Sequence, residues 1–115
     1  MEIPEIDVPE IDVDALAEII DEAAAGGAAV RLVDVREPDE FDEAHVPGAV
    51  SVPLATVPDN LAAFEGTTYV ICQAGGRSLR ACEFAVAQGL DGVVNVAGGT
   101  GAWIRSGRPT AGGGR

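Results

Sequence analysis

Residues 67–78, TTYVICQAGGRS, decide the fold of this chain. The run 67–71 is β-branched and aromatic, which predicts a buried strand. Cys72 ends that run, and two adjacent glycines, Gly75 and Gly76, follow within four residues. From Leu79 onward, apolar residues recur at helical spacing with polar residues between them. The segment therefore predicts a strand, a tight loop and a helix over 78–88, with a cysteine at the carboxyl end of the strand.

The loop after Cys72 has the composition of an anion-binding site. Ligands of open α/β sheets bind outside the carboxyl ends of the strands. Two glycines that can adopt positive φ allow successive N–H groups to converge, and the start of a helix adds partial positive charge. These surroundings favour the thiolate, which is the nucleophilic form of cysteine. The alternative is a purely structural cysteine that ends a buried strand.

Cys72 is therefore the candidate catalytic residue. Arg77 is expected to hydrogen-bond inward and stiffen the loop, or to help hold an anion. The candidate substrate-binding residues are those of the whole loop: Gln73, Ala74, Gly75, Gly76, Arg77 and Ser78.

This loop resembles the active-site loop of the rhodanese-like sulfurtransferases, Cys-x-x-Gly-x-Arg/Thr. Four further segments resemble the family's other motifs: Asp34-Val35-Arg36-Glu37 with Phe41, His45 to Ala49 with Val52-Pro53, Gly98-Gly99 with Trp103, and Gly107-Arg108-Pro109. The resemblance covers most of the chain. It implies a small α/β domain with a five-stranded, mostly parallel sheet and helices on both faces.

The resemblance implies a rhodanese-type, thiosulfate sulfurtransferase. Such an enzyme moves sulfane sulfur from a donor such as thiosulfate to cyanide or a thiol acceptor through a persulfide on Cys72. One activated cysteine and a ring of donors suffice, so no cofactor is expected. The side chains at positions 73 and 74 are neutral and favour no particular donor.

Two other functions compete with sulfur transfer. Cysteine-dependent phosphatases use Cys-x5-Arg, whereas four residues separate Cys72 from Arg77 here, which disfavours phosphate. A non-catalytic binding module is disfavoured because inactive rhodanese-like domains generally lack the loop cysteine. A persulfide carrier that serves a partner protein stays open, with that protein as the sulfur acceptor.

Three residues outside the loop are candidates for supporting roles. Asp34 and Arg36 are expected to form an ion pair that fixes loops near the site. His45 lies beside proline and glycine, so a hydrogen bond within a turn is favoured over a role as general base. Cys82 falls on the apolar face of the predicted helix and is expected in the core. One histidine and two cysteines ten residues apart match no zinc spacing, so no metal is expected.

Length and charge narrow the class of protein. A chain of 115 residues fits one domain. The net charge is −12 and no lysine is present, so neither nucleic acid nor an anionic membrane is an expected partner. No apolar run approaches the ~20 residues that span a bilayer, and the acidic N-terminus is no secretory signal. A cytoplasmic protein is expected.

The repeat Pro-Glu-Ile-Asp-Val, at 4–8 and 9–13, precedes a helix that Asp14 is expected to cap. The second copy is expected to supply the first strand. Further strands are expected at 29–33, 49–52 and 92–96, with helical turns at 37–41 and 54–64. The expected organisation is a flexible acidic leader at 1–9, a rhodanese-like domain at 10–109 and a disordered glycine-rich tail at 110–115.

Overall fold

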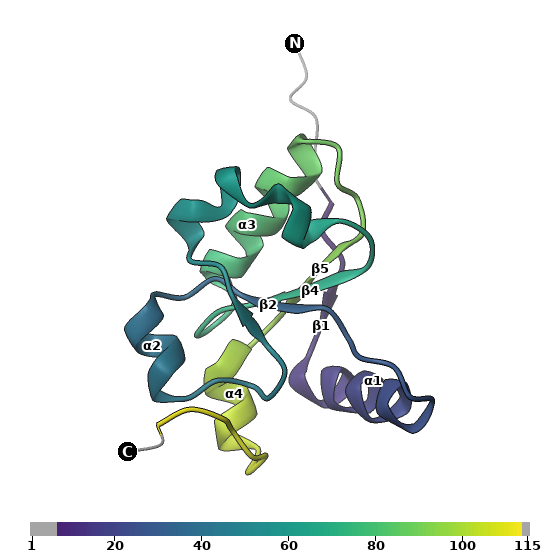
Figure 1. The fold of residues 1–115 in the computed structure, drawn as a ribbon, viewed down its shortest axis with the longest axis vertical. Helices are drawn as coiled ribbons and strands as arrows, with labels where there is room; N and C mark the ends of the chain where they lie inside the picture. Colours follow the sequence, from purple (N-terminus) through teal and green to yellow (C-terminus); the bar gives the residue numbers. More distant parts are fainter. Residues whose placement is uncertain (1–6, 114–115) are drawn as a thin grey trace.

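Five parallel strands form one sheet in the order β1-β5-β4-β2-β3 (Figure 1). The computed structural model describes residues 7–113. The strands are β1 (Glu10–Ile11), β2 (Leu32–Asp34), β3 (Val50–Ser51), β4 (Thr68–Ile71) and β5 (Val93–Val96). These parallel pairings confirm the predicted α/β fold. The mostly apolar sequence of β4 is typical of a strand in a parallel sheet that is covered on both faces.

Helices cover both faces of the sheet (Figure 1). They are α1 (Val13–Ala25), α2 (Pro38–Glu43), α3 (Gly76–Ala87) and α4 (Gly99–Arg105), with two 3-10 helices, η1 (Leu54–Asp59) and η2 (Leu61–Phe64). Successive residues of β4 point to opposite faces. Val70 packs in the cluster that includes residues of α3, η1 and η2, and Ile71 packs in the cluster of α1 and α4, which also contains Trp103.

The register of the sheet positions Cys72. Asp34 at the end of β2 pairs with Ile71 at the end of β4, and the N–H of Val35 donates to the carbonyl of Ile71 at 3.0 Å. The residues that follow the two strands therefore leave the sheet at the same edge. This places the Asp34–Arg36 segment beside the loop that begins at Cys72.

Two helix starts differ from those expected. Asp12, not Asp14, caps α1, because its Oδ1 accepts the N–H of Ala15 at 2.8 Å. Asp14 lies in the first turn and pairs with Arg108 at 2.9 Å. The third helix begins at Gly76 rather than at residue 78, since Gly75 adopts a φ of 112° and serves as the N-cap.

The segments that flank the domain carry backbone contacts. Asn95 donates its N–H to the carbonyl of Pro9, and Val8 packs against the core. In the expected tail, Ala111 forms an antiparallel bridge with His45, and Gly113 donates to the carbonyl of Asp42 at 2.7 Å. The part of the tail up to residue 113 is thus laid against the α2 region rather than free of it. Residues 1–6 and 114–115 lie outside the described residues.

Within residues 7–113, none of the helices combines the length and the apolar composition that crossing a membrane requires.

Replacing the cap of α1 tests the assigned helix start. Asp12→Ala should lower the free energy of unfolding by about 1 kcal/mol, because the N–H of Ala15 loses its acceptor. Urea unfolding followed by circular dichroism measures this. Asp12→Asn keeps an acceptor oxygen and should retain most of the stability. Equal losses in the two variants would show that the side chain acts through its charge and not as a cap.

Candidate active site

The sulfur of Cys72 lies in a small ring of hydrogen-bond donors. The N–H of Gly75 is 3.1 Å from Sγ, and the hydroxyl of Ser78 is 3.3 Å from it. The thiol group is buried, with 1% of the residue exposed. Because Gly75 has a left-handed conformation, the chain reverses within three residues and brings the first turn of α3 back over the sulfur.

The pKa of the Cys72 thiol is lowered from its usual value. Burial, the largest single effect, raises it. Hydrogen bonds from the Ser78 hydroxyl and from the backbone of Ser78, Gly75 and Ala74 together outweigh that effect. Donors stabilise the anion and not the neutral thiol, so the ring favours the thiolate.

The start of α4 fixes the orientation of the loop. The N–H groups of Thr100 and Gly101 donate to the carbonyls of Cys72 and Gln73, at 2.8 and 3.0 Å. Gly99 has a φ of 60°, and a Cβ there would collide with the carbonyl oxygen of Cys72. The Gln73 carbonyl and the Ala74 N–H belong to one planar peptide group, so turning that carbonyl toward α4 directs the Ala74 N–H toward the sulfur, where it helps to lower the Cys72 pKa. The sequence showed the glycine pair at 98–99 only as a family motif, without this role.

A buried asparagine supports the loop from the sheet. Asn95 of β5 is 1% exposed, and its Nδ2 donates to the carbonyl of Gly75 at 3.2 Å and to Oε2 of Glu10 at 2.8 Å. Sequence reasoning did not single it out. The available signal was a polar residue inside an otherwise apolar strand.

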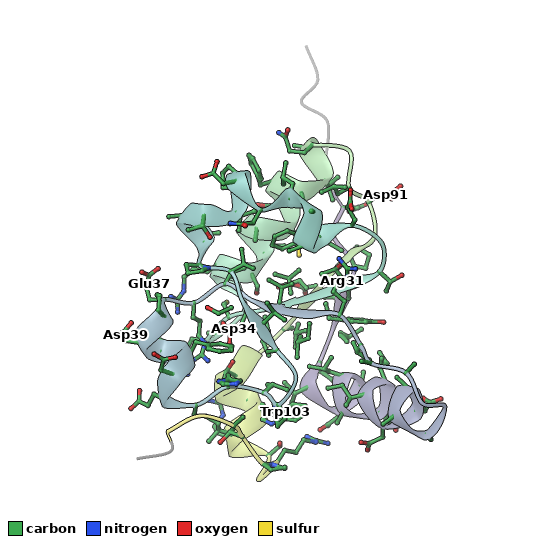
Figure 2. The ribbon with its side chains drawn as sticks, in the orientation of Figure 1. Arg31, Asp34, Glu37, Asp39, Asp91 and Trp103 are labelled. Carbon is green, nitrogen blue, oxygen red and sulfur yellow. The ribbon has the colours of Figure 1, made fainter. Side chains whose placement is uncertain are left out.

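Asp34 and Arg36 form the expected ion pair, and both are buried. Figure 2 shows Asp34 between the sheet and α2, with Glu37 and Asp39 on the outer side of that helix. The Arg36 guanidinium also donates to the carbonyl of Ala44 at 2.7 Å and to Oε1 of Gln73 at 3.3 Å. The pair therefore ties the end of β2 to the end of α2 and to the nucleophile loop.

Arg77 does not turn inward as expected. Its guanidinium forms a bidentate pair with Glu40 of α2, at 2.7 and 2.9 Å. This pairing lowers the pKa of Glu40 to about 2. The physical reason for the difference is that residue 77 lies in the first turn of α3, so its side chain extends across to the neighbouring helix. Glu40 is a residue that sequence reasoning missed.

The other two candidates have structural surroundings. Nδ1 of His45 is 2.7 Å from the carbonyl of Phe41, and the two rings stack with centroids 3.7 Å apart. Cys82 is fully buried in the core, as expected, and burial is the main cause that raises its pKa to about 12. Cys82 is therefore a neutral thiol.

A shallow hollow lies beside the loop that follows Cys72. It is lined by residues of α2, of α4, of the segment after β2 and of the Cys72 loop. Its lining consists of Arg36, Glu40, Glu43, Ala44, Gln73 and Ile104. Among residues 7–113, no cluster of three or more histidine, cysteine, aspartate and glutamate side chains could hold a metal ion.

The profile of the rhodanese-like domain family matches residues 12–106. The chain belongs to the rhodanese-like family. It is 33% identical over 104 residues to a protein named sulfurtransferase from Allochromatium vinosum, covering 89% of this chain and 94% of the relative. A rhodanese-like domain protein of Staphylococcus aureus superposes with a TM-score of 0.73 at 36% identity, covering 84% of this chain and 91% of the other.

A third relative is an uncharacterized protein of Synechocystis sp., 43% identical over 84 residues. The match covers 71% of this chain and 47% of that protein, so the chain spans less than half of its length. Proteins similar to this chain thus differ in overall size, and the relative from Allochromatium vinosum is the one named for sulfur transfer.

The donor ring predicts the ionisation of the two cysteines. Iodoacetamide alkylation followed against pH by mass spectrometry should show Cys72 titrating below a free thiol, because only the thiolate reacts. Ser78→Ala removes one donor and should raise the pKa of Cys72. Ser106→Ala is the matched control, because it removes a serine hydroxyl at the C-terminal end of α4 that does not contact the sulfur. An unchanged Cys72 profile in the Ser78 variant would contradict the role of the hydroxyl.

Proposed function

We propose that the protein is a sulfurtransferase that carries sulfane sulfur as a persulfide on Cys72. The observation that supports this most strongly is the thiol with its lowered pKa, enclosed by the N–H of Gly75 and the hydroxyl of Ser78. A ring of this size suits one sulfur anion, and membership of the family agrees with it.

The first half-reaction loads the cysteine. With thiosulfate as the donor, the Cys72 thiolate attacks the sulfane sulfur, a new S–S bond forms, and the old S–S bond breaks. The electron pair of the broken bond leaves with sulfite. The product is a deprotonated persulfide, whose negative charge has moved to the terminal sulfur. The loop's N–H groups and the helix start stabilise that charge without a cofactor.

The second half-reaction unloads it. Cyanide or a thiolate attacks the terminal sulfur, the S–S bond to Cys72 breaks, and the enzyme thiolate is restored. The product with cyanide is thiocyanate. Sulfur transfer in two steps through one cysteine predicts ping-pong kinetics. The chemistry needs a free thiol, for which a reducing compartment such as the cytoplasm is suited.

The geometry gives less support to a phosphatase. Only three residues separate Cys72 from the start of α3 at Gly76. A phosphatase loop also needs an arginine clamp over the oxyanion, whereas the Arg77 guanidinium is already bound bidentately to Glu40. A persulfide carrier for a protein acceptor remains the alternative, and turnover separates it from an enzyme.

Cysteine substitutions test the assignment. Cys72→Ser should abolish thiosulfate:cyanide sulfur transfer, and Cys82→Ala should keep most of it, because only Cys72 lies in the donor ring. Mass spectrometry after incubation with thiosulfate should find one added sulfur atom on Cys72. An active Cys72→Ser protein would sink the assignment. A stable persulfide that small acceptors do not discharge would favour the carrier.

Loop size is tested by inserting one glycine between Ala74 and Gly75. Sulfur transfer should fall steeply, since donors move beyond hydrogen-bond reach of the sulfur, while affinity for vanadate should rise. Thiocyanate formation and vanadate binding measure the two effects. Wild-type turnover of an aryl phosphate at a rate matching sulfur transfer would refute the proposal.

A further inference from the structure

Arginine pairing shows which cations of this acidic chain are already engaged. Within residues 7–113, Arg36, Arg77 and Arg108 form salt bridges, and Arg31 donates to backbone carbonyls. Arg80 and Arg105 make neither kind of contact in that part of the chain. Both side chains are exposed, so their guanidinium groups are accessible to a ligand from solution.

Arg105 lies beside the nucleophile loop. A Cβ built on Gly101 of α4 would be 3.1 Å from Nε2 of Gln73 and 3.2 Å from Nη1 of Arg105. The two nitrogens therefore converge on the same small space, which is open because residue 101 is a glycine. Both are donors, and the acceptor oxygen of Gln73 is already taken by Arg36 at 3.3 Å. Within residues 7–113, neither nitrogen donates to a protein acceptor, so both are available to a ligand.

The other arginines near the loop are already paired with carboxylates. Asp34 neutralises Arg36 and Glu40 neutralises Arg77. The donors that contact Sγ are the Gly75 amide and the Ser78 hydroxyl, so Arg105 lies outside the ring that holds the transferred sulfur. An anionic group bound by Arg105 is therefore a different part of the donor from the sulfur that Cys72 receives.

We propose that Arg105, together with Nε2 of Gln73, binds the carboxylate of a small sulfur donor whose persulfide group meets Cys72. This inference rests on the proposed sulfur transfer and names the donor class, which is the persulfide of a thiol that carries a carboxylate. A guanidinium matches a carboxylate through two parallel hydrogen bonds. The Cys72 thiolate attacks the donor's terminal sulfur, the donor's S–S bond breaks, and the carboxylate-bearing thiolate leaves.

Two donors that differ in one end group isolate this interaction. They are 2-carboxyethyl persulfide and 2-hydroxyethyl persulfide, each generated from its symmetrical disulfide and hydrosulfide and discharged to cyanide. Arg105→Gln should raise KM for the carboxylate donor about fivefold, the contribution of one exposed charge pair, with kcat unchanged. KM for the hydroxyl donor should not change. Arg105→Lys keeps the charge and should restore part of the affinity.

Arg31→Gln is the matched control. It removes the same charge, but residue 31 directly precedes β2 and so lies at the amino edge of the sheet, opposite the site (Figure 2). KM for both donors should stay at the wild-type value, which separates local binding from the field of the whole protein. A cation in the last turn of a helix also stabilises that helix, and that effect would change unfolding without separating the two donors.

The outcomes distinguish this inference from the proposed function. Equal KM changes for the two donors in Arg105→Gln, or none, would overturn the role of Arg105 and leave sulfur transfer intact. If the wild-type protein used neither persulfide but still transferred sulfur from thiosulfate to cyanide, the donor class alone would be overturned. Failure with thiosulfate as well would overturn the proposed function too.

Discussion

The structure depends most on how the peptide groups after Cys72 are turned. Two hydrogen bonds from the start of α4 hold the carbonyls of Cys72 and Gln73 away from the sulfur. The Ala74 N–H, which shares a peptide group with the Gln73 carbonyl, can then act on the thiol together with the Gly75 N–H, and the pKa of Cys72 is lowered. Gly99 permits this approach, because any side chain there would collide with the Cys72 carbonyl. The closing glycine motif is thus a part of the nucleophile's surroundings.

Charge at the site is arranged in neutral pairs. Buried Asp34 and Arg36 join β2 to the loop, and Glu40 and Arg77 join α2 to the first turn of α3. Removing one partner of the buried pair would leave an uncompensated charge, which is far more costly than replacing both. These pairs hold the frame, while the loop's N–H groups are left to act on the sulfur. Positive charge that can bind a substrate must then come from an arginine outside these pairs, and Arg105 is such a residue.

The sequence predicted the fold because each strand and helix has its own local signal. The apolar β4 and the glycines after Cys72 sufficed to place the nucleophile at a sheet edge. What it could not predict depends on contacts between segments far apart in the chain. Arg77 was expected inward because its partner, Glu40, lies 37 residues away. Asn95 and Arg105 acquire their surroundings only when β5 and α4 pack against the loop, and no local pattern encodes that. Asp12 was missed as the cap because two aspartates two residues apart satisfy the same local rule.

The two cysteines show what distinguishes a nucleophile in this fold. Both are buried, at 1% and 0% exposure, and burial raises the pKa of each. At Cys82, burial and then charge repulsion from Glu83, Glu10 and Cys72 raise the pKa to about 12. Cys72 has the Ser78 hydroxyl and three backbone amides, and its pKa falls. Since burial raises the pKa of both thiols, the hydrogen-bond donors around Cys72 are what lower its pKa. Reactivity therefore depends on the strand–loop–helix geometry and not on how deeply the cysteine is buried. A cysteine within α3, as Cys82 shows, lacks these donors and stays a neutral thiol.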